Sequence, residues 1–287
     1  MTSCFFVTDL HGKIERYQKL FQAIITERPE AVFLGGDFLP LPIYRPKSLN
    51  ISRQDFIYKF LVKQLARLRQ ELKDAYPRVF LIMGNDDPRI EEAAVLDVAS
   101  QGIWEYIHNR KVGFHDFHIY GYACVPPTPF RIKDWERYDV SRYVDPGCIS
   151  PEEGIRTFPV SDQEKRYATI QDDLARLAGD DNLDKAIFLL HAPPYKTTLD
   201  LAALEGKMID HVPLDPHVGS IAIRRFIETR QPLLTLHGHI HESAKLSFSW
   251  RDVIGRTSCF SAAHHGPELA LVRFDPDCLK AATRQLI

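Results

Sequence analysis

Five short apolar segments of the sequence are each followed directly by side chains that can bind a metal ion. In chain order these side chains are Asp9 and His11, Asp37, Asn85, His191, and His239 with His241. Asp and Asn oxygens with neutral imidazoles, and no thiolate, suit Mn²⁺, Fe²⁺, Zn²⁺, Co²⁺ or Ni²⁺. If each apolar segment is a strand of an open α/β sheet, these side chains lie at the carboxyl edge, where such sheets bind ligands. The spacing therefore predicts a centre for divalent cations.

No single one of these motifs is specific. An Asp that follows two glycines, as Asp37 does, is common in turns and helix caps, and His191 before two prolines could be a buried core histidine. The pair His239 and His241 is a stronger signal, because residues two apart point to the same side of a strand. The ordered set of five motifs carries the prediction. His237, close before the last pair, is expected to pack beneath the site and not to bind metal.

Alternating strands and helices would bring these motifs together. Short apolar runs predict strands over 3–8, 31–34, 78–83, 186–190 and 233–236, and three- and four-residue apolar spacing predicts helices over 14–26, 55–75, 162–177 and 221–229. Stretches of alternating polarity between 244 and 274 predict antiparallel strands that close a second sheet. The pattern is typical of an α/β sandwich with buried, largely parallel strands.

With its motifs in this order, the sequence resembles the calcineurin-like metallophosphoesterase superfamily over most of the chain. The resemblance implies a four-layer αββα sandwich of two mixed sheets, two divalent metal ions, and hydrolysis of a phosphoester by a hydroxide shared between them. Two cations roughly 3.5–4 Å apart need an anionic bridge, which the implied role of Asp37 supplies. The implied ligands are Asp9, His11, Asp37 and His241 for the first ion, and Asp37, Asn85, His191 and His239 for the second.

One position departs from the family's pattern. The third motif is usually Gly-Asn-His followed by an acid, and that His helps to protonate the leaving oxygen, whereas Asp86 stands in its place here and Asp87 in the acidic place. Nearby cations favour a charged carboxylate, so Asp86 would be ionised at neutral pH and unable to donate a proton. His217 is the first candidate for a substitute acid, or else a helix-entry residue before Ser220, the expected helix cap. Asp86 and His217 are thus the candidate catalytic residues.

The chain is expected to form a single domain over 1–287, with a Pro-rich irregular excursion at about 123–160. Loops of this length are often functional lids, and a structured surface excursion is an equally good interpretation. Trp135 and Tyr138 within it could stack on a base or aryl group, or anchor the loop to the core.

Composition limits the environment and the partners. The 36 Lys and Arg against 38 Asp and Glu give a formal charge of −2, which argues against nucleic acid as a partner, because such partners need a cationic face. The five cysteines form no CxxC pair, and the first residues suggest a strand, not a signal peptide. No apolar run reaches the ~18 residues that span a bilayer. We therefore expect a cytoplasmic protein with no membrane partner. Arg45 and Lys47 could meet phosphate, or be solvated.

Together these features favour a metal-dependent phosphohydrolase, and more narrowly a phosphodiesterase acting on a small or nucleotide-like phosphoester. An anionic Asp86 would make a dianionic monoester bind less well than a monoanionic diester. The alternatives are a DNA-directed nuclease of the same superfamily and a catalytically silent scaffold with the same fold. The complete ligand set argues against the scaffold, because carboxylates and imidazoles gathered without metal would be costly. The sequence leaves open the substrate, the oligomeric state and the native metal, for which manganese is one candidate.

Overall fold

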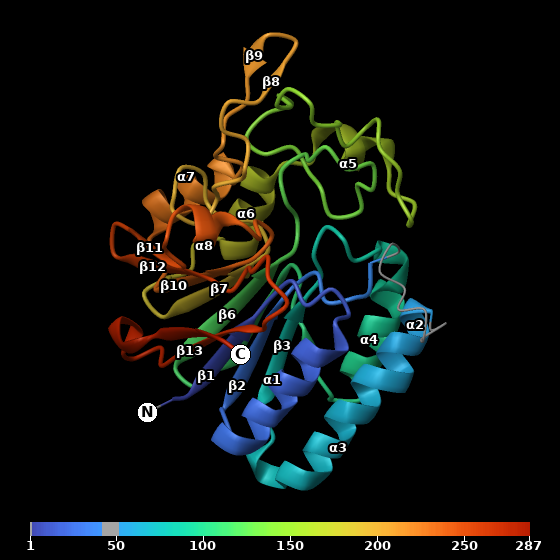
Figure 1. Cartoon of the computed structure of the whole chain (residues 1–287), viewed down its shortest axis with the longest axis vertical. Coiled ribbons are helices and arrows are strands. Elements are labelled where there is room, and N and C mark those ends of the chain that lie inside the picture. Colours follow the sequence, from blue (N-terminus) through green and yellow to red (C-terminus); the bar gives the residue numbers. More distant parts are fainter. Residues whose placement is uncertain (1, 42–51) are drawn as a thin grey trace.

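Two six-stranded sheets pack face to face and carry helices on their outer faces (Figure 1). The computed structural model describes residues 2–41 and 52–287, so Arg45 and Lys47 lie outside the described residues. The predicted fold class, a four-layer α/β sandwich of two mixed sheets, is confirmed. In the described ranges, no helix combines the length and the apolar character needed to cross a membrane.

The first sheet carries the three N-terminal metal motifs. Its strands β1 to β4 run parallel to one another, while β13 pairs antiparallel with β1 and β14 antiparallel with β13. Across the sheet the order is β14 (Thr283–Leu286), β13 (Ala270–Phe274), β1 (Cys4–Val7), β2 (Ala31–Gly35), β3 (Arg78–Ile82) and β4 (Glu105–Tyr106). The parallel pairing places the carboxyl ends of β1, β2 and β3 at one edge.

The second sheet carries the remaining motifs. Its strands β12, β10, β7 and β6 are parallel, and antiparallel strands flank them on both sides. The order is β11 (Arg251–Ile254), β12 (Thr257–Ser261), β10 (Leu234–His237), β7 (Ala186–Leu190), β6 (Phe117–Tyr122) and β5 (Arg110–Phe114). A small separate hairpin, β8 (Met208–Ile209) with β9 (Val212–Pro213), lies between β7 and β10 in the sequence.

The C-terminal region differs from its prediction in two ways. Residues 244–274 were expected to close the second sheet, but only β11 and β12 do so, whereas β13 pairs with β1 of the first sheet. The alternating stretch at 245–248 is not a strand, because it overlaps the short helix α8 (Ser243–Leu246). Alternating polarity shows that a segment can form a strand, but it does not identify the strand with which that segment pairs.

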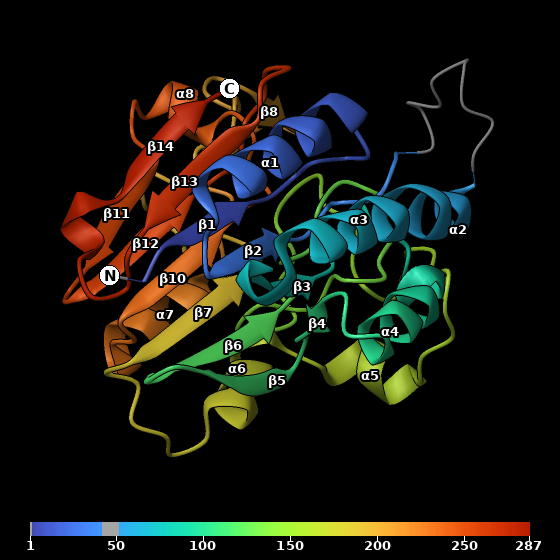
Figure 2. The ribbon, with the colours of Figure 1, turned by 90° about the horizontal axis from the view of Figure 1, so that it is seen from below.

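The helices form the two outer layers, and Figure 2 shows α1 (Ile14–Glu27) and α3 (Lys63–Leu72) over the first sheet and α7 (Ile221–Arg230) over the second. The helix predicted over 55–75 is a continuous run of α2 (Arg53–Asp55), a π-helix (Phe56–Val62), α3 and a 3₁₀ turn (Lys73–Ala75). The helix predicted over 162–177 is two helices, because extended Thr169 separates them and caps the second by accepting a hydrogen bond from the Asp172 N–H. The remaining bounds are 3₁₀ turns at Arg89–Glu91 and Leu279–Ala281, α4 (Glu92–Ser100), α5 (Asp162–Tyr167) and α6 (Ile170–Ala178).

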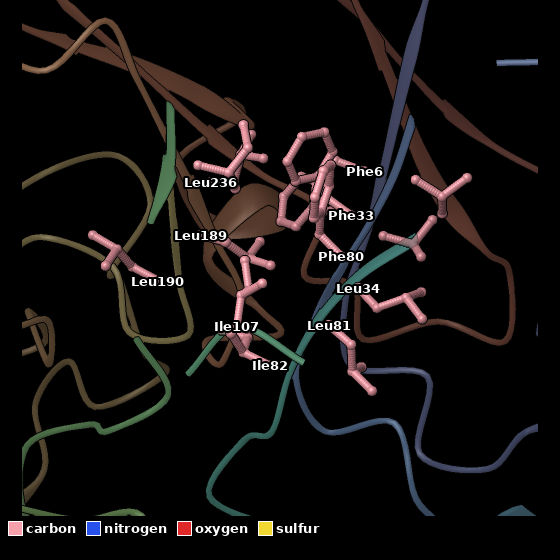
Figure 3. Packing of buried hydrophobic residues seen from close by; sticks show 14 of the residues in the cluster. Phe6, Phe33, Leu34, Phe80, Leu81, Ile82, Ile107, Leu189, Leu190 and Leu236 are labelled. Atoms are coloured by element: carbon pink, nitrogen blue, oxygen red, sulfur yellow. The ribbon is translucent and has the colours of Figure 1, made fainter. Parts of the chain in front are cut away.

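The main core lies between the two sheets. Alternate side chains of each central strand point to opposite faces, so Phe33 and Phe80 face Leu189 of the second sheet while Leu34 points the other way (Figure 3). The Phe33 and Phe80 ring centroids are 5.1 Å apart. Because helices cover the strands on the outside, both faces of each central strand are buried, which explains their continuous apolar sequence.

The Pro-rich excursion at 123–160 is held to the body by buried polar contacts. The indole N–H of buried Trp135 donates to the Asp87 carbonyl (2.7 Å), so this side chain anchors the loop to the core. Lys133 and Glu136 form an ion pair with no exposed side-chain surface. The Asp139 carboxylate accepts hydrogen bonds from the Ile221 N–H (2.6 Å) and from the hydroxyl of Ser220, which caps α7 as predicted. The excursion is therefore structured and anchored to the body of the protein.

We expect Asp139→Ala to lower the free energy of unfolding by about 1–3 kcal/mol. The substitution removes the carboxylate that accepts hydrogen bonds at the start of α7 and that connects the excursion to this helix. Urea unfolding followed by far-UV circular dichroism measures the change. Asp180→Ala, which removes an exposed carboxylate from the turn after α6, is the matched control. Equal midpoints for the two variants would contradict the anchoring role of Asp139.

Candidate metal centre

Five loops deliver the predicted ligands to the carboxyl edge of the two sheets. Asp9, His11, Asp37 and His239 all have left-handed backbone, with φ of 55°, 47°, 50° and 72°. Such backbone costs of order 1–3 kcal/mol per non-glycine residue, so the surrounding structure has to enforce it. Backbone hydrogen bonds do so here: the Asp9 N–H donates to the Gly36 carbonyl (3.0 Å) and the His11 N–H to the Asp37 carbonyl (2.8 Å).

Asp9, His11 and His241 form a first group of possible ligands. One ligand atom from each lies within 4.8 Å of the others. The two Nε2 atoms of His11 and His241 are 3.1 Å apart, and His241 Nε2 is 3.4 Å from Asp9 Oδ1. These residues come from the first and the last motif, 230 positions apart, so the packing of one sheet on the other brings them together.

Asp9, Asp37 and His191 form a second group within the same 4.8 Å limit, and Asn85 adjoins it. His191 Nε2 lies 3.2 Å from Asp37 Oδ2 and 3.1 Å from Asn85 Oδ1. Its Nδ1 lies 2.7 Å from the Gly35 carbonyl, which can only accept, so Nδ1 carries a proton. This contact fixes the ring orientation with Nε2 turned toward the carboxylates, as second partners of metal-binding histidines do.

His239 lies beside these groups. Its backbone N–H is 3.2 Å from both carboxylate oxygens of Asp9, and its ring centroid is 5.3 Å from that of His191. Its ring nitrogens are not among the close groups of ligand atoms in the described part of the chain. His237 packs beneath the site as expected, since its two ring nitrogens meet the Ala192 carbonyl (2.8 Å) and the Thr235 hydroxyl (2.7 Å).

The electrostatics of the cluster favour added positive charge. Asp9 is 0% exposed and Asp37 2%. Burial opposes ionisation of each, but the neighbouring imidazoles outweigh it and hold the pKa of both carboxyls below the usual value. Burial likewise disfavours a charged His191, yet the Asp37 and Asp9 carboxylates raise its pKa to about 10.

The donor set fits divalent cations. Two buried carboxylates, one amide oxygen and imidazole nitrogens converge without any thiolate, a combination suited to hard or intermediate metals. His11 Nδ1 is buried and makes no hydrogen bond to any described residue, which leaves a buried polar atom without a protein partner. The carboxylates of Asp9 and Asp37 would together offset half the charge of a pair of divalent cations.

Asp86 and Asp87 have different roles. The Asp86 N–H donates to Asp37 Oδ1 (2.8 Å), and its carboxylate reaches 3.9 Å from His11 Nδ1, so Asp86 faces the centre. Burial, and then the Asp37 carboxylate, raises the pKa of Asp86 to about 7, whereas a bound cation acts in the opposite direction. Asp87 points away and accepts from the N–H groups of Leu39 (2.8 Å) and Gly84 (2.9 Å), which braces one motif loop against the next.

His217 is not brought into these groups of ligand atoms. Its Nδ1 lies 2.8 Å from Asp200 Oδ1, in the loop between β7 and α7, and Ser220 caps α7 three residues later. The structure therefore places His217 in a loop at the same edge of the second sheet as His191, and outside the groups of ligand atoms.

Sequence reasoning missed Arg16. This buried guanidinium donates from Nη1 to the Asp9 carbonyl (2.5 Å) and from Nη2 to the Gly266 carbonyl (2.5 Å), so it ties the first motif to the loop before β13. The available signal was its position: Arg16, Leu20 and Ile24 follow at four-residue steps, which puts Arg16 on the buried face of α1.

Comparisons with known proteins agree with this geometry. The model of the calcineurin-like phosphoesterase family matches residues 3–243, so the chain belongs to this family of phosphoester hydrolases. The crystal structure of TT1561 from Thermus thermophilus is 15% identical, with a TM-score of 0.53 over 99% of this chain and 98% of that one. A dimetal phosphatase from Danio rerio is 11% identical, with a TM-score of 0.50 over 94% of each chain. At these identities the likeness concerns the fold alone. No curated protein sequence matches the chain.

We expect Gly84→Ala to weaken metal binding by about 10–100-fold, the range seen when groups that support ligands are disturbed. An added Cβ would lie 2.3 Å from Asp37 Oδ1 and 2.5 Å from its backbone nitrogen, so Asp37 would have to move. Titration with Mn²⁺ followed by calorimetry measures the affinity. Gly113→Ala is the control, because nothing lies within 4 Å of its added Cβ. Equal affinities in the two variants would show that this close approach does not position Asp37.

Proposed function

We propose that the protein is a metal-dependent phosphodiesterase that hydrolyses small or nucleotide-like phosphoesters. The observation that carries the proposal is the convergence of Asp9 and Asp37, both buried, with imidazoles from both sheets at one edge of the sandwich. We assign Asp9, His11, Asp37 and His241 to one divalent cation, and Asp37, Asn85, His191 and His239 to the other.

Two bound divalent cations would supply a hydroxide nucleophile at neutral pH and neutralise charge on the phosphoryl oxygens. The chain's own residues hold this arrangement. Asp37 adjoins His191 on one side and His11 with Asp86 on the other, which supports its role as the shared ligand. The Gly35 carbonyl orients His191, and the His239 N–H orients the Asp9 carboxylate.

The preference for diesters rests on Asp86. Its carboxylate faces the centre, 3.9 Å from His11 Nδ1, where it adds negative charge near the position of the substrate. A monoester carries two negative charges at neutral pH and a diester one, so like-charge repulsion disfavours the monoester more. A carboxylate held ionised by cations also has no proton to give, so Asp86 itself cannot protonate the leaving oxygen.

We expect Asp37→Asn to abolish turnover more completely than His241→Ala, because Asp37 is assigned to both cations and its loss removes a negative charge that offsets them. The measurement is hydrolysis of bis-p-nitrophenyl phosphate by chelator-treated protein reloaded with saturating Mn²⁺. Equal residual rates in the two variants would contradict a shared Asp37. Wild-type protein that binds metal without hydrolysing any phosphoester would favour the scaffold alternative, and cleavage of DNA alone would favour the nuclease.

In protein whose other candidate donor is removed by His217→Asn, we expect Asp86→His to raise the rate on alkyl diesters by about tenfold or more while changing the rate on p-nitrophenyl diesters little. General-acid help is worth ~10²–10⁴-fold and matters most for poor leaving groups. The readout is the slope of log kcat/KM against leaving-group pKa for a series of aryl and alkyl diesters. Asp86→Asn, which removes the charge without adding a donor, is the matched control. If Asp86→His/His217→Asn and His217→Asn alone give the same slope, position 86 does not face the leaving oxygen.

A further inference from the structure

His217 and Asp200 form a buried-to-surface pair that the proposed metal chemistry does not use. Asp200 has no exposed side-chain surface and accepts hydrogen bonds from the N–H groups of Lys196 (2.9 Å), Thr197 (2.9 Å) and Gly219 (3.2 Å). Three backbone donors hold this carboxylate in one orientation and satisfy its charge. The fixed carboxylate in turn holds its side-chain ring partner, His217, in place.

The contact determines which nitrogen of His217 is free. Its Nδ1 lies 2.8 Å from Asp200 Oδ1, and since an ionised carboxylate only accepts, Nδ1 carries a proton. The free atom is Nε2, and Asp200 keeps the ring in place. The His217 side chain is 26% exposed, so the ring is not sealed in the core. Carboxylate-oriented histidines of this kind serve as general acids and bases.

The loop that carries this pair is hydrogen-bonded to the loops of the last two metal motifs, the one with His191 and the one with His241. Leu201 pairs with His217 as an isolated antiparallel bridge, and the Ala202 N–H donates to the Pro216 carbonyl (2.8 Å). On one side the next residue, Ala203, donates its N–H to Glu242, which directly follows His241 (3.2 Å).

On the other side the Ser220 N–H donates to the Pro193 carbonyl, two residues after His191 (2.8 Å). The two paired segments, one at Leu201 and the other at His217, thus contact both the His191 loop and the His241 loop.

We propose that His217, oriented by Asp200, donates the proton to the leaving oxygen of the substrate, in place of the His that Asp86 replaces. This rests on the proposed phosphodiesterase function. As the hydroxide oxygen bonds to phosphorus, the bond from phosphorus to the leaving oxygen breaks and its electron pair stays on that oxygen. The oxygen takes the proton from His217 Nε2 and leaves as an alcohol. Neutral His217 then regains a proton from solvent, so the net reaction consumes one water.

The test is the same series of aryl and alkyl diesters with His217→Asn in Mn²⁺-loaded protein. We expect the rate on alkyl diesters to fall by about 10²–10⁴-fold and the rate on p-nitrophenyl diesters to change little, so that the slope against leaving-group pKa becomes steeper. The double variant Asp86→His/His217→Asn is expected to recover much of the alkyl rate. Asp200→Asn is expected to shift the slope in the same direction by less, because the ring remains but loses its fixed orientation.

His118→Asn is the control, since His118 is exposed and pairs with Ala186 at the amino end of β7, the opposite edge of the sheet. A uniform loss on every substrate with an unchanged slope would overturn the donor role and mark His217 as structural. Wild-type protein inactive on all diesters would instead refute the proposed function. Circular dichroism and metal content of each variant separate loss of folding from loss of the proton donor.

Discussion

Two buried carboxylates, Asp9 and Asp37, are the constraint on which the rest of the site depends. Each is almost fully removed from water, and both belong to one group of ligand atoms within 4.8 Å. Two negative charges in a low-dielectric interior repel each other and lose their hydration, which is costly unless positive charge and hydrogen-bond donors surround them. The chain supplies backbone N–H groups from Asp86 and His239 and a ring of imidazoles. Divalent cations would offset the negative charge that these groups leave unbalanced.

The fold can be understood as the frame that holds these two charges in place. Asp9 and Asp37 follow neighbouring parallel strands of one sheet, whereas their imidazole partners His191 and His241 follow strands of the other. The distance between the sheets is set by the side chains packed between them, with Phe33 and Phe80 of the first sheet against Leu189 of the second (Figure 3). Large substitutions in that core would therefore move ligands as well as destabilise the protein.

The motifs could be located from the sequence because each lies directly after a buried strand, and parallel strands bring their ends together by geometry alone. The placement of β13 could not be predicted, because its alternating sequence fits the edge of either sheet and only its pairing with β1 decides. The break between α5 and α6 depends on Thr169, which is extended and caps α6 although the surrounding sequence has helical spacing. Arg16 and Asp200 were missed because their partners are mainly backbone groups, which the sequence does not identify.

Anomalous diffraction from crystals of the protein grown with Mn²⁺ tests most directly whether the buried carboxylates hold a pair of cations. We expect two anomalous peaks per chain, one among Asp9, His11 and His241 and the other among Asn85 and His191, with the Asp37 carboxylate between them. A single peak with Asp37 bound to one ion only, or peaks remote from these side chains, would contradict that role of the two carboxylates.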